Sequence, residues 1–335
     1  MTFEPVLDSL KLCDISDEEY FGPKYSSYIS NSRLKLIDPK EDGSPLTFFE
    51  GLSKHNIFTS SLEFGSAVHA LFLQPDDFML CDVVSKPTAK LGQMADALYP
   101  NYKHLTDDLI IAASNKVDYY KGKMNELKID KVKTGCESYW RDRELFEKDY
   151  KGKETPIYLN SKDRNKVKQC LTNLKKNREI TSIMHPDSIL GEAMSLNEQT
   201  LLLDVIAREN DQECLLHLKA KLDNFTINPM DNEINMNDLK TTGHDVGVFS
   251  SDSWIKYHYY RQAAFYSWLL IMLSKKQYSL NNPNLRSNFM LVSSIPPCEC
   301  GVYKASVKDF KKGMKEFKEL LTLVAHYTMY PNEIY

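Results

Sequence analysis

The sequence contains neither a long apolar run nor a secretory pattern. Apolar residues make up 42% of the chain, but they are dispersed, and no segment approaches the roughly 18 consecutive apolar residues that a membrane span requires. The N-terminus lacks a basic segment followed by an apolar one, which is the usual secretory signal. We therefore expect no membrane partner and a cytoplasmic location.

The cysteines of the sequence do not have the number or spacing of a disulfide framework. The seven cysteines are odd in number and scattered, which is typical of reduced thiols in the cytosol rather than of a disulfide framework. Cys298 and Cys300 form one close pair. Two ligands without a second pair are compatible with a metal site or with an ordinary loop.

The chain has no excess of positive charge. It carries 42 Lys and Arg against 46 Asp and Glu, a net charge of -4. This argues against a passive coat on DNA, but it permits an enzyme with a local basic groove. Residues 151–178 contain nine Lys or Arg, opposed by Glu154 and Asp163 alone. This basic stretch is either a solvated helix face or a surface that follows phosphates.

Neither internal repeats nor low-complexity segments are present, so 335 residues suit one large domain or two ordinary ones. Residues 1–27 show no clear period and are expected to form an irregular arm, followed by helices up to residue 185. Strands at 189–196 and 201–208, joined by a polar turn at 197–200, then begin a strand cluster. Later elements are predicted in this order: strands 215–225 and 233–242, a helix at 251–274, strands 289–295 and 302–307, and a helix at 308–327. The pattern predicts an α+β (mixed α/β) fold with one central sheet flanked by helices.

Two acids and a lysine fall on neighbouring predicted strands. Asp223 lies near the end of one strand, and Asp238 and Lys240 lie in the next. Because side chains alternate along a strand, Asp238 and Lys240 share one face and Leu239 points to the other. Carboxylates are hard oxygen ligands suited to Mg²⁺ or Mn²⁺. A lysine beside such a cation can orient an attacking water, and can deprotonate it if the lysine pKa is lowered. These are residue types that phosphodiester hydrolysis requires.

Further polar residues join this group. Gln262 and Tyr266 are four positions apart in a predicted helix and therefore share a face. Glu192 could contribute another acid from a neighbouring strand. His69 lies in a predicted upstream helix beside small and apolar residues, where a histidine taken alone is usually structural. Buried polar groups in this number need partners, and a metal–phosphate site supplies them.

These segments together resemble the PD-(D/E)xK nuclease superfamily, and within it the RecB-like branch of RecE-type phage and prophage exonucleases (exonuclease VIII). The resemblance is carried by four segments that span residues 64–266: Phe64-Gly65-Ser66-Ala67-Val68-His69, Lys221-Leu222-Asp223, Asp238-Leu239-Lys240-Thr241-Thr242, and Tyr257-His258-Tyr259-Tyr260-Arg261-Gln262-Ala263-Ala264-Phe265-Tyr266. Leu222 stands where the motif nominally has proline.

The resemblance implies a role for each of these residues. It makes His69, Asp223 and Asp238 metal ligands, with the backbone carbonyl of Leu239 completing the set. Lys240 would position the nucleophilic water. Gln262 and Tyr266 match a Q-xxx-Y motif that contacts the DNA strand in the family. Glu192 matches an acidic position of the RecE-like group. The implied cofactor is Mg²⁺, with Mn²⁺ able to substitute. An iron–sulfur cluster is not expected, because the group of cysteines that holds it in some relatives is incomplete here.

The resemblance also implies a restriction-endonuclease-like core at residues 186–335. A helical region at 1–185 would contribute His69, and the two together would form one compact unit. The implied activity is exonucleolytic hydrolysis of linear duplex DNA, from 5′ to 3′, in recombination or phage DNA metabolism in a bacterial or phage-infected cytoplasm. A single-strand annealing protein and a homo-oligomeric ring are the implied partners. An endonuclease or single-strand nuclease of the same superfamily is an alternative, as is a non-catalytic module that binds DNA ends.

Overall fold

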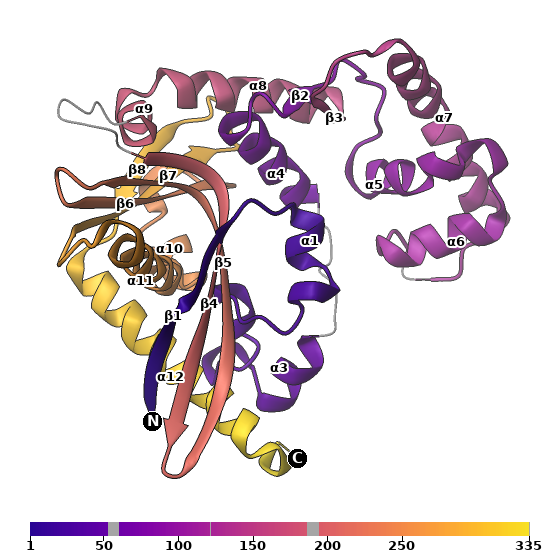
Figure 1. Ribbon diagram of the computed structural model, residues 1–335. Coiled ribbons are helices and arrows are strands. Elements are labelled where there is room, and N and C mark those ends of the chain that lie inside the picture. The colour runs from indigo at the N-terminus through magenta and orange to yellow at the C-terminus, as the bar shows by residue number, and fades with distance from the viewer. Residues whose placement is uncertain (53–59, 121, 186–193, 335) are drawn as a thin grey trace. The chain divides into compact units, whose positions relative to one another are not determined.

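The computed structural model describes residues 1–52, 60–120, 122–185 and 194–334 (Figure 1). Its contacts group into two compact units. The sheet unit comprises Met1–Asn56, Leu174–Ser293 and Glu299–Tyr335, and the helical unit comprises Ile57–Asn173 and Ser294–Cys298. This grouping divides the chain differently from the predicted boundary between residues 185 and 186, because the first strand of the chain pairs within the sheet.

The sheet unit is built on six strands. In spatial order they are β1 (Thr2–Cys13), β4 (Met194–Glu209), β5 (Gln212–Asn228), β6 (Glu233–Thr242), β7 (Asn284–Ser293) and β8 (Cys300–Lys304). All neighbours are antiparallel except β6 and β7, which are parallel. A parallel pair needs a crossover connection, and helices supply it here. The predicted α+β class, a central mixed sheet flanked by helices, is confirmed.

The two long helices of the sheet unit, α11 and α12, pack against each other over its core. The helical elements of this unit are α1 (Asp17–Phe21), η1 (Pro23–Tyr25), α2 (Asn31–Leu34), η2 (Pro39–Glu41), α3 (Pro45–Gly51), α9 (Arg178–Met184), η4 (Val246–Val248), α10 (Ser253–Lys256), α11 (Tyr259–Tyr278), α12 (Val307–Met329) and η5 (Pro331–Glu333). Phe265 of α11 stacks on Phe317 of α12 with ring centroids 4.6 Å apart. A side chain at Gly313 would collide with the carbonyl of Tyr260, so glycine lets the two helices approach closely.

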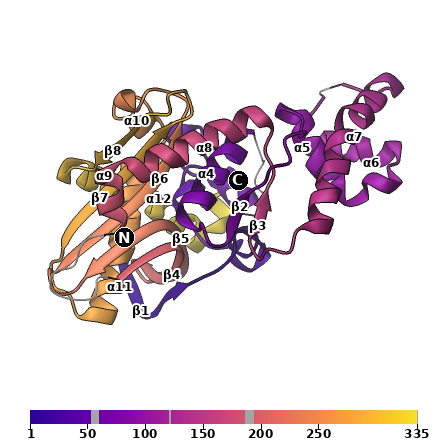
Figure 2. The ribbon, with the colours of Figure 1, turned by 90° about the horizontal axis from the view of Figure 1, so that it is seen from above.

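The helical unit has its own core. Its elements are α4 (Ser60–Leu73), β2 (Phe78–Leu80), α5 (Ala89–Leu98), η3 (Tyr99–His104), α6 (Asp107–Lys116), α7 (Glu126–Asp149), β3 (Thr155–Ile157) and most of α8 (Ser161–Lys176). The helices α5, α6 and α7 group together (Figure 2). Trp140 of α7 is buried, and its Nε1 donates to the carbonyl of Ala95 at 2.8 Å. None of the helices among the described residues combines the length and apolarity needed to cross a membrane.

The predicted turn at 197–200 is wrong. Residues 194–209 form the single strand β4, which pairs with β5 without a change of register. Glu198 nevertheless adopts a left-handed backbone conformation, with φ at 52°. The buried apolar residues of β5 also change parity nearby, from Leu222 to Phe225. When the alternation of apolar and polar residues is interrupted by several polar residues, the sequence resembles a turn. Here both strands continue through the interruption, and the buried side chains change from one face of the strand to the other.

Two other boundaries differ from the sequence prediction. The expected irregular arm begins with β1, an edge strand whose register shifts between Val6 and Lys11, and this shift obscures the period of its side chains. The helix expected at 251–274 is divided into α10 and α11. His258, with φ at 52°, separates them, because a residue in the left-handed region cannot continue a right-handed helix.

Candidate active site

The candidate site lies where β5 and β6 separate. The last residue pair between these strands is Asn224 with Asn237. Asp223 and Asp238 are the next residues along each strand beyond that pair, and from there β6 continues beside β7. The sheet therefore forks at this point, and both carboxylates stand at the opening of the fork.

Asp238 is held by two side chains. It is 2% exposed, its Oδ2 lies 2.5 Å from Nζ of Lys240, and its Oδ1 accepts a 2.5 Å hydrogen bond from Nε2 of Gln262. Lys240 and Asp238 are two residues apart on β6, so the ion pair reflects the alternation of the strand. Gln262 reaches the pair from the first turns of α11. The structure thus brings together three residues that the sequence singled out.

Asp223 is tied to the backbone across the fork. Its Oδ2 accepts a 2.7 Å hydrogen bond from the N–H of Leu239, which takes the place of a backbone bond that the separated strands no longer make. Burial raises the pKa of Asp223, and the charge of Lys240 and the Leu239 N–H offset this only in part. A raised pKa is expected for a carboxyl that shares a buried site with other acids.

Lys240 and Tyr266 both hold their protons. Burial lowers the pKa of Lys240, but the carboxylates of Asp238 and Asp223 outweigh burial, so the net shift is upward. Burial raises the pKa of Tyr266 well above its ordinary value, and the charges of Tyr20 and the two aspartates add to the rise. The lysine is therefore a cation and the phenol is a hydrogen-bond donor at neutral pH.

Glu198 is an acid that the sequence analysis missed. It lies on β4, and one of its carboxylate oxygens is within 4.8 Å of one from Asp223. Burial and the charge of Asp223 raise the pKa of Glu198 to about 7, while Lys221, with Nζ 3.2 Å from Oε2, opposes the rise. Glu198 and Asp223 fall between the residue pairs Asn197–Asn224 and Gln199–Leu222. A sequence prediction with one continuous strand over 194–209 would have placed the two acids near each other. Glu192 lies outside the described residues.

Two other predicted features belong wholly or mainly to the helical unit. His69 is half-buried on α4 of the helical unit, and its assignment as a ligand stays a prediction. The basic stretch at 151–178 lies mainly on α8.

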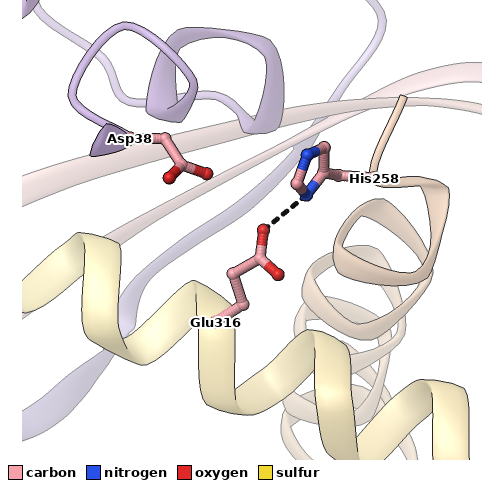
Figure 3. Close-up of side chains that lie close together, drawn as sticks. All are labelled: Asp38, His258 and Glu316. Carbon is pink, nitrogen blue, oxygen red and sulfur yellow. Dashed lines mark hydrogen bonds and ion pairs between the residues drawn. The ribbon is translucent and has the colours of Figure 1, made fainter. Parts of the chain in front are cut away.

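A second cluster of ionisable side chains lies inside the sheet unit (Figure 3). Ligand atoms of Asp38, His258 and Glu316 lie within 4.8 Å of one another. However, NH1 of Arg261 lies 3.0 Å from Oδ2 of Asp38 and 2.9 Å from Oε1 of Glu316. His258 contacts Glu316 through Nδ1 at 2.6 Å and Glu41 through Nε2 at 2.8 Å. Because the guanidinium already bridges two of the carboxylates, we interpret the cluster as a structural clamp that joins α11, α12 and η2.

A buried lysine tethers the N-terminal segment to β5, four residues before Asp223. Lys219 is 1% exposed, and its Nζ donates to the carbonyls of Tyr20 and Tyr25 at 2.6 and 2.9 Å. Burial, with a smaller contribution from the charge of Arg33, lowers the pKa of Lys219 to about 8. Since the ordinary value is near 10.5, between these pH values the unfolded chain binds a proton that the folded chain does not.

We expect this tether to appear in the pH dependence of stability. The free energy of unfolding of the wild type, minus that of Lys219→Met, should rise between about pH 8 and pH 10.5. Urea unfolding at pH 7.5, 9 and 10.5 measures the difference. Lys304→Met, at a lysine of β8 that is 63% exposed, is the control for the loss of a lysine charge at the surface. A flat difference for Lys219→Met would show that the lysine is solvated.

The chain has a distant likeness to solved structures. No protein-family model matches the chain, and no curated protein matches it. Among solved structures, a protein from Eubacterium rectale called a "putative exonuclease" aligns with a TM-score of 0.46 and 12% sequence identity, over 93% of this chain and 86% of that chain. An identity this low transfers no residue assignments, so the chemistry of the site is inferred from its own side chains.

Proposed function

We propose that the chain is a metal-dependent deoxyribonuclease with its active site at the fork between β5 and β6. One observation carries the proposal: Asp223, Asp238 and Lys240 stand together at the fork, with Gln262 bonded to Asp238. Two carboxylates and a lysine in this arrangement can hold a divalent cation and a water beside a phosphodiester.

The donor set at the fork suits Mg²⁺ or Mn²⁺. Both cations prefer oxygen ligands, and Asp223 and Asp238 supply carboxylates. The N–H of Leu239 points to Asp223, and the N–H and C=O of a strand residue point to the same edge, so the Leu239 carbonyl also faces the fork. The resemblance adds His69 as a further ligand. A bound cation would neutralise charge on the scissile phosphate and lower the pKa of a coordinated water.

Four side chains at the fork would have separate roles in the hydrolysis. Lys240 keeps its proton, so its ammonium would orient the attacking water and stabilise negative charge rather than act as a base. Gln262 fixes the rotamer of Asp238 through Oδ1. The phenol of Tyr266 can donate to a phosphate oxygen of the DNA strand. Glu198, with a pKa of about 7, can exchange a proton near neutral pH.

The finer features of the proposal come from the resemblance. They are degradation of linear duplex DNA from the 5′ end, a ring-shaped homo-oligomer, a single-strand annealing partner, and a role in recombination or phage DNA metabolism. The basic stretch at 151–178 is the proposed path for phosphates. An endonuclease of the same class would use the same chemistry on different substrates.

Digestion of DNA with a label at one end tests the proposal. With Mg²⁺, the protein should release nucleotides from linear duplex DNA and leave covalently closed circles intact. A 5′ label should be released before a 3′ label if the enzyme proceeds from the 5′ end. A chelator should abolish release, because the cation would neutralise charge on the phosphate and activate the water.

The outcomes separate the alternatives. Cleavage of closed circles would identify an endonuclease, and release from single strands alone would identify a single-strand nuclease. Binding of DNA ends without cleavage, and without uptake of Mn²⁺ in calorimetry, would favour the non-catalytic module and contradict the proposed activity.

A further inference from the structure

Four asparagines, of which Asn224, Asn237 and Asn288 are buried and Asn197 is half-buried, form a row across the sheet beside the candidate site. Nδ2 of Asn288 donates to Oδ1 of Asn237 at 2.8 Å, Nδ2 of Asn237 to Oδ1 of Asn224 at 2.6 Å, and Nδ2 of Asn224 to Oδ1 of Asn197 at 2.7 Å. The four residues are directly paired on β7, β6, β5 and β4. We call this chain of amides the asparagine row. Each bond points the same way, from β7 towards β4.

The asparagine row adjoins the acids of the site. Glu198, Asp223 and Asp238 are the next residues on β4, β5 and β6. Glu198 and Asp223 fall between the residue pairs Asn197–Asn224 and Gln199–Leu222, and Asp223 and Asp238 stand on the two sides of the fork. These three are the acid row. Asn237 and Asp238 are neighbours on β6, so their side chains point to opposite faces of the sheet. Asp238 meets Gln262 of α11, whereas Nδ2 of Asn237 also donates to the carbonyl of Ile183 in α9 at 3.5 Å.

The position of the row at the fork gives it a specific role. Asn224 and Asn237 are the last pair before β5 and β6 separate, so their amide bond is the final side-chain link between the two strands before the carboxylates. The distance between Asp223 and Asp238 therefore depends on the Asn224–Asn237 bond and on the hydrogen bond from the N–H of Leu239 to Asp223. A slip of one residue between the strands would move one acid to the wrong face. The same slip of one residue would break the amide bond between the strands, because it would set Asn224 opposite Met236 or Asp238.

We infer that Asn224 and Asn237 are positioning residues that set the spacing of the two metal-binding carboxylates, an inference that rests on the proposed function. They touch neither substrate nor cation and act through Asp223 and Asp238. Groups that orient ligands in this way typically change metal affinity by about 10- to 100-fold when they are replaced. Asn288 belongs to the same row, but its neighbour on β7 is Phe289, so it adjoins no acid.

Calorimetric titration of the DNA-free protein with Mn²⁺ tests this role. The variant Asn237→Thr keeps a residue that suits a strand but cannot bridge to Asn224. Its Mn²⁺ dissociation constant should rise at least tenfold, and the metal concentration that gives half of the maximal nuclease rate should rise with it. The rate at saturating Mn²⁺ should recover most of the wild-type value, because the catalytic groups remain. Asn237→Ser serves as the second variant if threonine strains the sheet.

The matched control is Asn288→Thr, which makes the same chemical change in the same row. It should lower stability by a similar amount and leave the Mn²⁺ dissociation constant within about twofold of the wild type. Equal shifts in Asn237→Thr and Asn288→Thr would overturn the positioning role and indicate a general loosening of the sheet, as would an unchanged constant in Asn237→Thr. Absence of Mn²⁺ binding by the wild type would instead overturn the proposed function.

Discussion

Replacement of Lys240 by alanine should lower the rate of DNA hydrolysis by about 10³-fold while the protein stays folded. The ammonium lies 2.5 Å from Asp238 and keeps its proton. Removing it takes away the charged donor that pairs with Asp238, and the loss of such a donor costs about 10²–10³ in rate. Single-turnover digestion of linear DNA at saturating Mg²⁺ measures the effect on the chemical step.

A comparison with another lysine of the same sheet separates charge at the site from charge in general. Lys304 of β8 is 63% exposed and pairs with Glu179, and Lys304→Ala should keep the wild-type rate. The Lys240→Ala variant should still bind Mn²⁺, since both carboxylates remain. A rate within tenfold of the wild type in Lys240→Ala would contradict the assignment of the active site to the fork.

Replacement of Arg261 by leucine should lower the free energy of unfolding by about 3–5 kcal/mol, because it leaves buried carboxylates without their cation. Arg261 is 2% exposed and bonds to Asp38 and Glu316, which are 1% and 5% exposed. It also donates from Nε to Oδ1 of Asn31 at 3.0 Å. Urea denaturation followed by circular dichroism measures the change, provided that the transition is two-state.

An exposed arginine provides the reference. Arg286 is 57% exposed and pairs with Glu233 at 3.0 Å, and Arg286→Leu should change stability by less than about 1 kcal/mol. The triple variant Arg261→Leu, Asp38→Asn, Glu316→Gln should recover part of the loss, since it removes the uncompensated charges. A change below 1 kcal/mol in Arg261→Leu alone would show that the clamp is solvated.

Local patterns in the sequence located the elements that carry the site. The predicted strand at 233–242 coincides with β6, and the predicted helix at 308–327 falls within α12. The helix is long enough for its apolar period to be unambiguous, and the strand directly follows a turn signal at residues 228–232. The spacing of Asp238 and Lys240 follows directly from the alternation of a strand, and the structure pairs their side chains. These inferences needed only neighbouring residues.

Contacts between residues far apart in the chain could not be predicted from local patterns. The polar residues 197–200 resemble a turn in sequence, yet they lie within β4, where Glu198 and Asp223 fall between the residue pairs Asn197–Asn224 and Gln199–Leu222. The asparagine row likewise depends on four strands whose registers the sequence does not state. Arg261 resembled an ordinary helix residue, because its partners Asp38 and Glu316 are 223 and 55 residues away. Such contacts arise from topology rather than from local period.

The pairing of β1 with β4 has a consequence for the order in which the protein folds. Residues near the N-terminus pair with residues about two hundred positions later, while the main segment of the helical unit, Ile57–Asn173, is contiguous. During synthesis that segment emerges complete before β4 leaves the ribosome. β1 must wait, unpaired, until its partner strand is made, and contacts so distant in sequence slow folding. The first strand of the chain is therefore among the last to find its place in the sheet.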